Sequence, residues 1–211
     1  MPTLSPELDG HVGAAPSAWN TLLTADGGKS FDSTTDIASG TAGASSVNTS
    51  EFGAYRKREA FFQFDCSSIT STVSSAVLKI YIDSVSGAQV VRGYKGTFSG
   101  TVSVNYFNDF NTSIPYTNAV ESQAGGYKEY ILTPSALSDL ESENDFKIVM
   151  VDDTYVPTAD VPPNGTLLVT NYKFSEDADH PPELEYTLTS EIAGRIILTN
   201  RIQLTSGKIA L

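Results

Sequence analysis

Strict alternation of apolar and polar residues in segment 183–189 is the feature that most constrains the fold of this chain. Leu184, Tyr186 and Leu188 share one side of a predicted strand, and the polar residues between them share the other. Segment 76–83 places Ala, Leu and two Ile residues on one face in the same way. Strands with one buried and one wet face are typical of antiparallel sheets, because parallel sheets are usually covered on both faces.

Short segments with strand-like composition recur along the chain, most of them bounded by Gly, Pro, Asn or Asp. The predicted strands are 59–65, 76–83, 89–94, 101–107, 126–132, 146–151, 166–174 and 183–189. The stretch 26–50, rich in Gly, Ser, Thr, Ala and Asp, predicts an irregular connection with at most short edge strands. One short helix is predicted, with Thr133 as N-cap, Pro134 at its first position and Leu140 near its end. This pattern indicates an all-β protein, an antiparallel β-sandwich or jelly roll.

The chain has 211 residues, enough for one generous sandwich domain. We expect a body over residues 1–189 and a C-terminal tail of extended strand over residues 190–211. The tail holds Arg195, Arg201 and Lys208 against Glu191, so it carries +2 of a net charge of −12 and the body carries −14.

An apolar and slightly basic strand attached to an acidic body would be an aggregation hazard if it stayed exposed, so the tail is expected to pair with another strand. Two outcomes remain open: pairing with a neighbouring subunit or a second copy, and folding back as two extra strands of the same domain. The candidate assembly residues are Arg195, Ile197, Arg201, Ile202, Leu204, Lys208 and Ile209.

Charge and hydropathy exclude several classes of partner. A pI near 4.4 leaves no basic stripe to displace counterions from nucleic acid, and it disfavours an anionic membrane surface. No apolar run approaches the roughly 20 residues that span a bilayer. The first seven residues, 1–7, lack the basic and apolar regions of a secretory signal. We therefore expect neither nucleic acid nor membrane as partner, and synthesis in a cytoplasm without secretory export.

Catalytic residues are not predicted. Nucleophilic catalysis needs a base near Ser or Cys, and the two histidines, His11 and His180, stand in no such motif. His180 with Asp177 and Asp179 could ligate a metal, but a solvated acidic turn is favoured because such spacing is unspecific. The lone Cys66 is expected to be a buried structural thiol. No pair of acids is marked for glycoside hydrolysis, so we expect a protein that is not an enzyme.

A structural Ca²⁺ ion is the one cofactor considered. Asp26, Asp32 and Asp36 lie in the Gly- and Ser-rich stretch, and Asp152 and Asp153 follow a predicted strand. None of these acids completes a calcium-loop signature, so no metal site is predicted.

Aromatic residues around the middle strands are the candidate ligand site. Sugar rings stack on exposed aromatic faces and are oriented by a few polar groups. The candidates are Tyr94, Tyr106, Phe107, Phe110 and Tyr116, with Phe98 nearby in the sequence. Burial in the sandwich core is the alternative for most of these residues, and it is favoured for Trp19, a further possible anchor.

Three parts of the chain resemble a known family. The stretch RKREAFFQFDCSSI at 56–69, followed by VSSAVLKIYI at 73–82, is similar to the core of the DNRLRE-type modules. Segment 172–187 resembles that family's last hairpin, and Asp9-Gly10-His11-Val12 resembles the start of such modules in virus-derived sequences. The resemblance spans roughly residues 9–189, and it departs at the signature hexapeptide and at the long C-terminal extension.

The resemblance implies a jelly roll similar to carbohydrate-binding modules, found in bacterial secreted proteins and phage virion proteins, with binding or structural roles and no catalytic residues. The first hypothesis is therefore a non-enzymatic virion structural protein, such as a capsid decoration or fibre-associated adhesion module. Its partners would be neighbouring virion subunits or further copies, and a cell-surface glycan is a further candidate. The alternatives are a free carbohydrate-binding module and, ranked lowest, a glycan-active hydrolase on the same fold.

Overall fold

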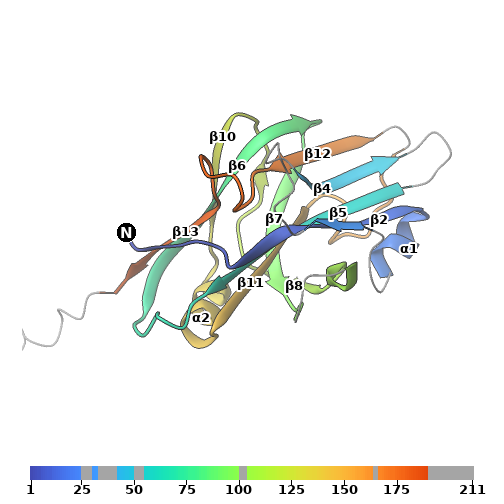
Figure 1. Ribbon diagram of the computed structural model, residues 1–211. Coiled ribbons are helices and arrows are strands. Elements are labelled where there is room, and N and C mark those ends of the chain that lie inside the picture. Colours follow the sequence, from blue (N-terminus) through green and yellow to red (C-terminus); the bar gives the residue numbers. More distant parts are fainter. Residues whose placement is uncertain (25–29, 33–41, 50–54, 100–103, 164–165, 190–211) are drawn as a thin grey trace, which may run out of the picture.

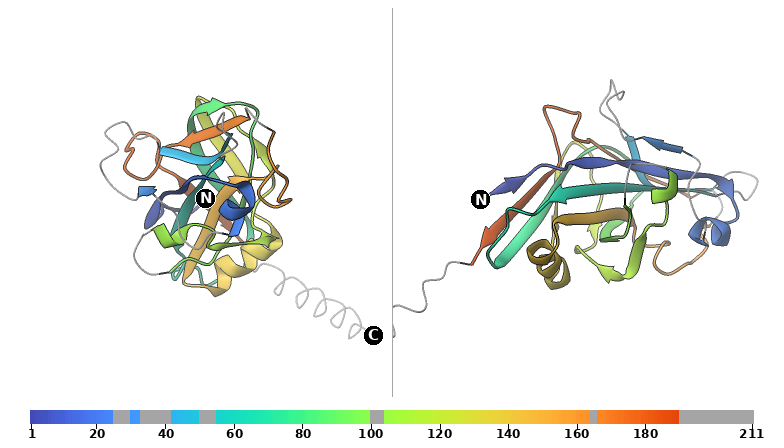
Figure 2. Two further views of the ribbon diagram at one scale, coloured as in Figure 1. Left: turned by 90° about the vertical axis from the view of Figure 1, so that its right-hand side faces the viewer. Right: turned by 60° about the horizontal axis from the view of Figure 1, so that its bottom comes forward.

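The computed structural model describes residues 1–24, 30–32, 42–49, 55–99, 104–163 and 166–189. These residues form an antiparallel β-sandwich, with α1 (Trp19–Thr24) near one end and α2 (Pro134–Ser142) beneath the strands (Figures 1 and 2). Every strand pairing among them is antiparallel. The predicted fold class is confirmed.

The described elements are thirteen strands, two α-helices and one 3₁₀ turn. The strands of the first half are β1 (Thr3–Leu4), β2 (Leu8–Ser17), β3 (Ser30–Asp32), β4 (Ala42–Thr49), β5 (Tyr55–Asp65), β6 (Val73–Ser86) and β7 (Val90–Gly96). Those of the second half are β8 (Phe110–Pro115), β9 (Val120–Glu121), β10 (Gly126–Ile131), β11 (Asp145–Asp152), β12 (Leu167–Tyr172) and β13 (Glu183–Leu188). The helices are α1 (Trp19–Thr24), α2 (Pro134–Ser142) and a 3₁₀ turn, η1 (Val104–Tyr106).

Two long strands organise the layers. In one layer β6 pairs with β10, β12 and β13, and β13 pairs with β1. In the other layer β5 pairs with β2, β4 and β11, and β11 continues to β7 and β8. Because β4 also pairs with β12, the two layers are joined along one side (Figure 1).

The first hydrophobic core lies between these layers. The inward residues of β6, Leu78, Ile80 and Ile82, pack in one cluster with Phe62 and Phe64 of β5 and with buried residues of α2. All five residues are fully buried. The alternation predicted for β6 is confirmed. In β13, Leu184 and Tyr186 point inward as predicted, whereas Leu188 is 39% exposed because the strand ends there.

The second hydrophobic core covers the opposite face of β5 and β11. Phe61 of β5 packs there against Phe98 and Tyr106, with ring centroids 5.7 and 5.1 Å away. Val149 and Val151 of β11 belong to the same cluster. The uninterrupted apolar run from Ala60 to Phe62 thus has its physical reason, because this part of the strand is covered on both sides.

Two predictions about secondary structure are wrong. Strand β4, within the stretch predicted to be irregular, is paired on both sides, by β5 and by β12. One of these partners, β5, is the next strand along the chain, but the other, β12, is distant in sequence, so the local composition does not reveal that β4 is paired on both sides. Residues 104–106 form η1 instead of a strand, and Tyr106 covers the second core from there. Residues 101–103 of that predicted strand lie outside the described residues.

The predicted helix is confirmed as α2. The Thr133 hydroxyl accepts a hydrogen bond from the Ala136 amide at 3.4 Å, and Pro134 opens the helix. The short helix α1 has no counterpart among the predicted elements. Within the described parts of the chain, no helix is long and apolar enough to cross a membrane.

Candidate functional site

The predicted aromatic platform is not an exposed surface in the structure. Tyr94, Tyr106, Phe107 and Tyr116 are each at most 2% exposed. Tyr116 stacks on Phe146 at 5.1 Å in the first core, and the others belong to the second core. A sugar ring can stack only on an exposed face, so the expectation is corrected for these four residues.

Phe110, the remaining candidate, is half-buried and packs against the second core. Its ring lies 5.0 Å from the Lys57 ammonium group. The predicted assembly residues lie in segment 190–211, outside the described residues.

The acids considered for calcium serve the fold where they are described. The Asp152 carboxylate accepts hydrogen bonds from the Thr154 and Tyr155 amides at 3.0 and 2.8 Å, so it fixes the turn after β11. Asp153 accepts a hydrogen bond from the Tyr94 hydroxyl at 2.6 Å. Asp26 and Asp36 and the side chain of Asp32 lie outside the described residues. In the part of the chain that is described, no three His, Cys, Asp or Glu side chains are grouped as metal ligands.

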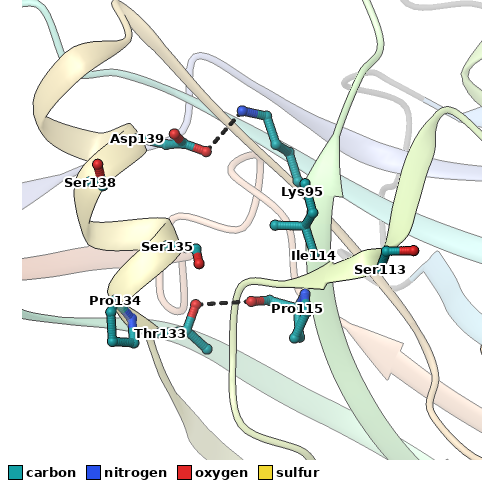
Figure 3. Close-up of a pocket in the computed structure, with 9 residues that line it drawn as sticks. All are labelled: Lys95, Ser113, Ile114, Pro115, Thr133, Pro134, Ser135, Ser138 and Asp139. Carbon is teal, nitrogen blue, oxygen red and sulfur yellow. Dashed lines mark hydrogen bonds and ion pairs between the residues drawn. The ribbon is translucent and has the colours of Figure 1, made fainter.

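A groove of about 680 Å³ runs between the start of α2 and strand β8 (Figure 3). Hydroxyl groups, two proline rings and one ion pair line it. The lining residues are Lys95, Ser113, Ile114, Pro115, Thr133, Pro134, Ser135, Ser138 and Asp139. The Thr133 hydroxyl donates to the Pro115 carbonyl at 2.9 Å, which ties α2 to β8 and closes one end of the groove.

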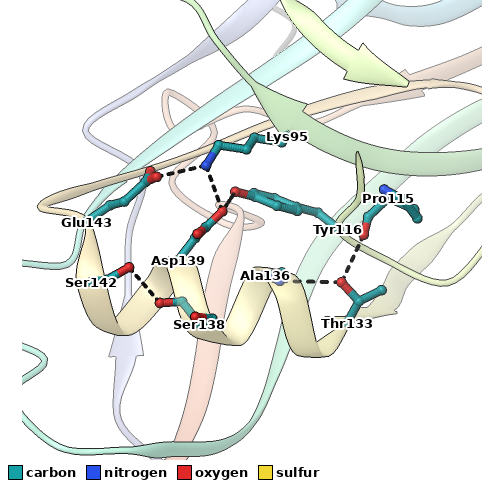
Figure 4. Close-up of polar contacts among 9 residues, drawn as sticks. All are labelled: Lys95, Pro115, Tyr116, Thr133, Ala136, Ser138, Asp139, Ser142 and Glu143. Atoms are coloured by element: carbon teal, nitrogen blue, oxygen red, sulfur yellow. Dashed lines mark hydrogen bonds and ion pairs between the residues drawn. The ribbon is translucent and has the colours of Figure 1, made fainter. Parts of the chain in front are cut away.

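The Lys95 ammonium group at this groove is paired with two carboxylates (Figure 4). The Lys95 ammonium group lies 2.8 Å from both the Asp139 and the Glu143 carboxylates. These hydrogen bonds, that to Asp139 first, raise the pKa of Lys95. The Tyr116 hydroxyl also donates to Asp139, and its pKa is raised chiefly by burial. The cation among the lining residues is therefore committed to two acids, so the groove suits a neutral polar ligand better than an anion.

A second candidate surface is the outer face of the β10-β6-β13 sheet, which points away from the first core. It consists of the outward side chains of these three strands, which are Tyr127, Glu129 and Ile131; Val77, Lys79 and Tyr81; and Glu183 and Glu185. In the register, Tyr127 lies opposite Tyr81, and Glu129 lies opposite Lys79. The face therefore carries aromatic rings at one end and paired charges beside them.

The aromatic end of the outer face comprises Tyr81, Tyr127 and His180. The Tyr81 ring centroid lies 4.0 Å from that of His180 and 5.5 Å from that of Tyr127, which meets it edge-on. Tyr127 is 41% exposed, and the His180 side chain is 38% exposed. The Tyr127 hydroxyl donates to the Pro181 carbonyl at 3.1 Å, and the Asp177 carboxylate accepts from the His180 amide at 3.0 Å. These contacts hold the rings in place.

Paired charges flank these rings. Lys79 lies 2.8 Å from Glu185, and this hydrogen bond raises the pKa of Lys79. Lys173 lies 3.1 Å from Asp177 and 3.6 Å from Asp83. Exposed rings beside fixed polar groups are what carbohydrate recognition requires, because the rings stack on C–H faces and the polar groups bind hydroxyls.

Sequence reasoning did not select Tyr81 or Tyr127 as site residues, although a signal was present. Both stand at outward positions of alternating strands, Tyr81 two residues after Lys79 and Tyr127 two residues before Glu129. The predicted acidic turn at His180 is present, with Asp177 accepting its amide hydrogen bond.

Cys66 is buried and free, as predicted. Burial raises the pKa of its thiol to about 12. The reactive thiolate is therefore scarce at neutral pH, which fits a structural role.

A scan against protein-family models and a search of curated proteins find no match for this chain. The likeness of residues 9–189 to the DNRLRE-type modules therefore stays an expectation.

Proposed function

We propose that this protein is a non-enzymatic structural and adhesive component of a virion, such as a capsid decoration or fibre-associated subunit. The sandwich body, residues 1–189, is displayed on the virion surface, and segment 190–211 contacts neighbouring subunits. Such a protein is made in the host cytoplasm and needs no secretory signal.

The observation that supports this proposal is the position at which segment 190–211 begins. Strand β1 lies opposite Leu184 and Glu185 of β13, and the Tyr186 amide donates to the Pro2 carbonyl at 3.1 Å. Leu188 lies beyond this pairing and is 39% exposed. The Thr189 amide donates to the Thr72 carbonyl at 2.8 Å. The end of the sheet is therefore fixed as far as Thr189, the residue before the segment. A partly exposed strand end beside an apolar segment favours strand addition between subunits.

Charge also favours contact between copies. The segment carries +2 and the remainder of the chain −14, so the basic segment of one copy is attracted to the acidic body of another.

The test is the solution mass, by light scattering, of the full chain and of a chain that ends at Thr189. We expect a defined oligomer for the full chain and a monomer for the shortened one. A full-length variant with Ile202→Ser and Leu204→Ser keeps length and charge, and it should also be monomeric. The same number of subunits for all three would contradict assembly through this segment.

A free carbohydrate-binding module is the second candidate, and the aromatic end of the outer face favours it. In this case the full chain is a monomer that binds a polysaccharide. Truncation of the exposed ring in Tyr127→Ala should weaken binding roughly tenfold, because a stacked ring contributes about 1 kcal/mol or more.

Affinity electrophoresis in gels that contain a panel of soluble polysaccharides measures this effect. Ile131→Ala is the matched control, since Ile131 lies on the same face of β10 at the opposite end. If no polysaccharide retards the protein and the protein is oligomeric in solution, the carbohydrate-binding candidate is contradicted and the virion proposal is the one that remains.

A further inference from the structure

Three polar side chains meet at the base of the second core: Lys57, Glu59 and Asn108, which we call the Lys57 cluster. Lys57 and Glu59 stand two residues apart on one face of β5, with side chains 1% and 0% exposed. The Lys57 ammonium group pairs with the Glu59 carboxylate and donates to the side-chain carbonyl of Asn108. The other Glu59 oxygen accepts a hydrogen bond from the backbone amide of Asn108 at 3.0 Å. Each residue therefore contacts the other two.

Apolar rings surround this cluster. The Phe107 and Phe110 ring centroids lie 4.9 and 5.0 Å from the Lys57 nitrogen. A pocket of about 280 Å³ reaches both Lys57 and Asn108. The reacting groups would thus be shielded by the rings while a small leaving group could escape.

The position of the Asn108 carboxamide is fixed. The backbone of Asn108 is in the left-handed region, with φ of 64°, which Asn tolerates better than most residues. Its side-chain nitrogen donates to the Leu22 carbonyl at 2.9 Å. The carboxamide carbon is therefore held next to the Lys57 nitrogen with its carbonyl oxygen toward the amine.

Burial disfavours the charged form of the Glu59 carboxylate, which is paired with Lys57. Desolvation raises the pKa of Glu59, against the opposing effects of Lys57 and of the Asn108 amide. In an apolar site a neutral amine beside a neutral carboxylic acid competes with the ion pair, and one proton transfer along their hydrogen bond converts one into the other. The neutral amine is the nucleophilic form of lysine.

We propose that Lys57 and Asn108 form an intramolecular isopeptide bond, with Glu59 as the proton carrier. The neutral Lys57 nitrogen attacks the side-chain carbonyl carbon of Asn108. Glu59 gives its proton to the departing side-chain nitrogen and regains one from the attacking nitrogen. The carbon–nitrogen bond of the carboxamide breaks, and one ammonia leaves. The products are a secondary amide and ammonia, and no oxidant, reductant or cofactor takes part.

The bond would join β5 to the segment that covers the second core. The chain has a single cysteine and so cannot make an internal disulfide. An isopeptide bond would supply a covalent tie that does not depend on the redox state of the surroundings, which suits a protein displayed outside a cell.

The intact mass of the denatured full-length protein tests this inference. We expect a mass lower than that of the sequence by one ammonia molecule, and a protease digest that yields one peptide pair joined through Lys57 and Asn108. A mass equal to that of the sequence, with no loss of ammonia and no joined peptides, would overturn the proposal. So would an ammonia loss confined to one peptide, because that is the signature of a succinimide.

Variants separate the roles of the three residues. Lys57→Met should restore the full mass, and Glu59→Gln should retain both reacting groups yet leave most of the protein uncross-linked. Lys95→Met is the matched control: it removes a lysine from another ion pair, so the ammonia loss should persist. Cross-linking in Glu59→Gln at the wild-type level would remove Glu59 from the reaction. The wild-type measurement decides the bond itself, even if a variant fails to fold.

Discussion

At the scale of single residues, Asp9 shows how a buried acid links distant parts of the chain. It lies on β2 and is 3% exposed. Its two carboxyl oxygens accept hydrogen bonds of 2.8 Å from the amide and the hydroxyl of Ser175, in the segment that follows β12. Burial outweighs these hydrogen bonds and raises the pKa of Asp9 to about 7.

The first prediction concerns the pH dependence of stability through Asp9. The folded protein keeps this proton up to about pH 7, whereas the unfolded chain releases it near its ordinary value of 3.8. Between these values the folded state holds more protons, so the contribution of Asp9 to the free energy of unfolding falls as the pH rises. The total fall is at most about 4 kcal/mol, at about 1.4 kcal/mol per pKa unit.

Urea unfolding of the wild type and of Asp9→Asn across this range measures the effect. The variant keeps an acceptor for the Ser175 amide but has no proton to lose, so it should gain on the wild type as the pH rises from about 4 to about 7. The difference between the two proteins isolates Asp9, because Glu59 and Asp152 also have raised pKa values. A constant difference across the range would show that Asp9 does not titrate there.

At the scale of elements, α2 depends on one cap that the sequence identifies. Thr133→Ala removes both the hydrogen bond to the Ala136 amide and the hydrogen bond to the Pro115 carbonyl. We expect a loss of about 1 kcal/mol or slightly more in the free energy of unfolding. The control is Ser138→Ala, an exposed position within α2, which should change stability by less than about 0.5 kcal/mol. Equal effects of the two substitutions on the free energy of unfolding would show that the Thr133 cap does not stabilise the protein.

Strand β7 depends on a residue without a side chain. A Cβ atom at Gly93 would overlap the Ile148 Cδ1 atom and lie 3.0 Å from the Met150 sulfur, and both neighbours are fully buried. Gly93→Ala should therefore destabilise the protein by about 1–3 kcal/mol, as overpacking does. Gly126→Ala in β10 meets nothing within 4 Å, so thermal unfolding should show no loss for it. If both variants melted alike, β7 and β11 would pack less tightly than their geometry indicates.

The sequence predicted those elements whose pattern is local. Alternation in β6 and β13 and the cap of α2 depend on neighbouring residues, and these predictions are confirmed except for Leu188 at the end of β13. Strand β4 has the small and polar residues of a loop, and one of its two partners, β12, lies far away along the chain. The burial of Tyr94 and Tyr116 has the same origin, since composition marks an aromatic ring but not the layer that covers it.

The candidate sites show the same division. The outward positions of Tyr81 and Tyr127 follow from alternation, and their meeting with His180 follows from tertiary structure. The Lys57 cluster depends on a residue 49 positions or more away from both β5 partners, so no local motif announces it.

At the scale of the whole molecule, β5 supports both hydrophobic cores. Phe62 and Phe64 belong to the core between the layers, while Phe61 belongs to the second core, where Lys57 and Glu59 also lie. Phe98, Tyr106 and Phe107, which belong to the second core, follow β7 in the chain. A covalent tie between Lys57 and Asn108 would therefore close a loop that includes β6 and β7, and it would restrict the unfolded chain as a whole.

The effect of that tie on stability has a sign opposite to that of a simple buried ion pair. Closing a loop of this length lowers the entropy of the unfolded state by an amount that corresponds to about 4 kcal/mol, by the account given for disulfides. A buried ion pair without a covalent bond behaves differently, because its replacement by similar-sized neutral residues is often neutral or stabilising by about 1–4 kcal/mol.

The double variant Lys57→Met with Glu59→Gln separates the two accounts. It removes both charges together, preserves side-chain size, and leaves a side-chain carbonyl at position 59 that can accept the Asn108 amide hydrogen bond. With an isopeptide bond in the wild type, the variant should unfold at a lower urea concentration, and its free energy of unfolding should be lower by up to about 4 kcal/mol. With an ion pair alone, it should be as stable as the wild type or more so. Size-exclusion chromatography in urea supplies a second readout, because a closed loop keeps the unfolded wild type more compact than the unfolded variant, whereas without the bond both elute together.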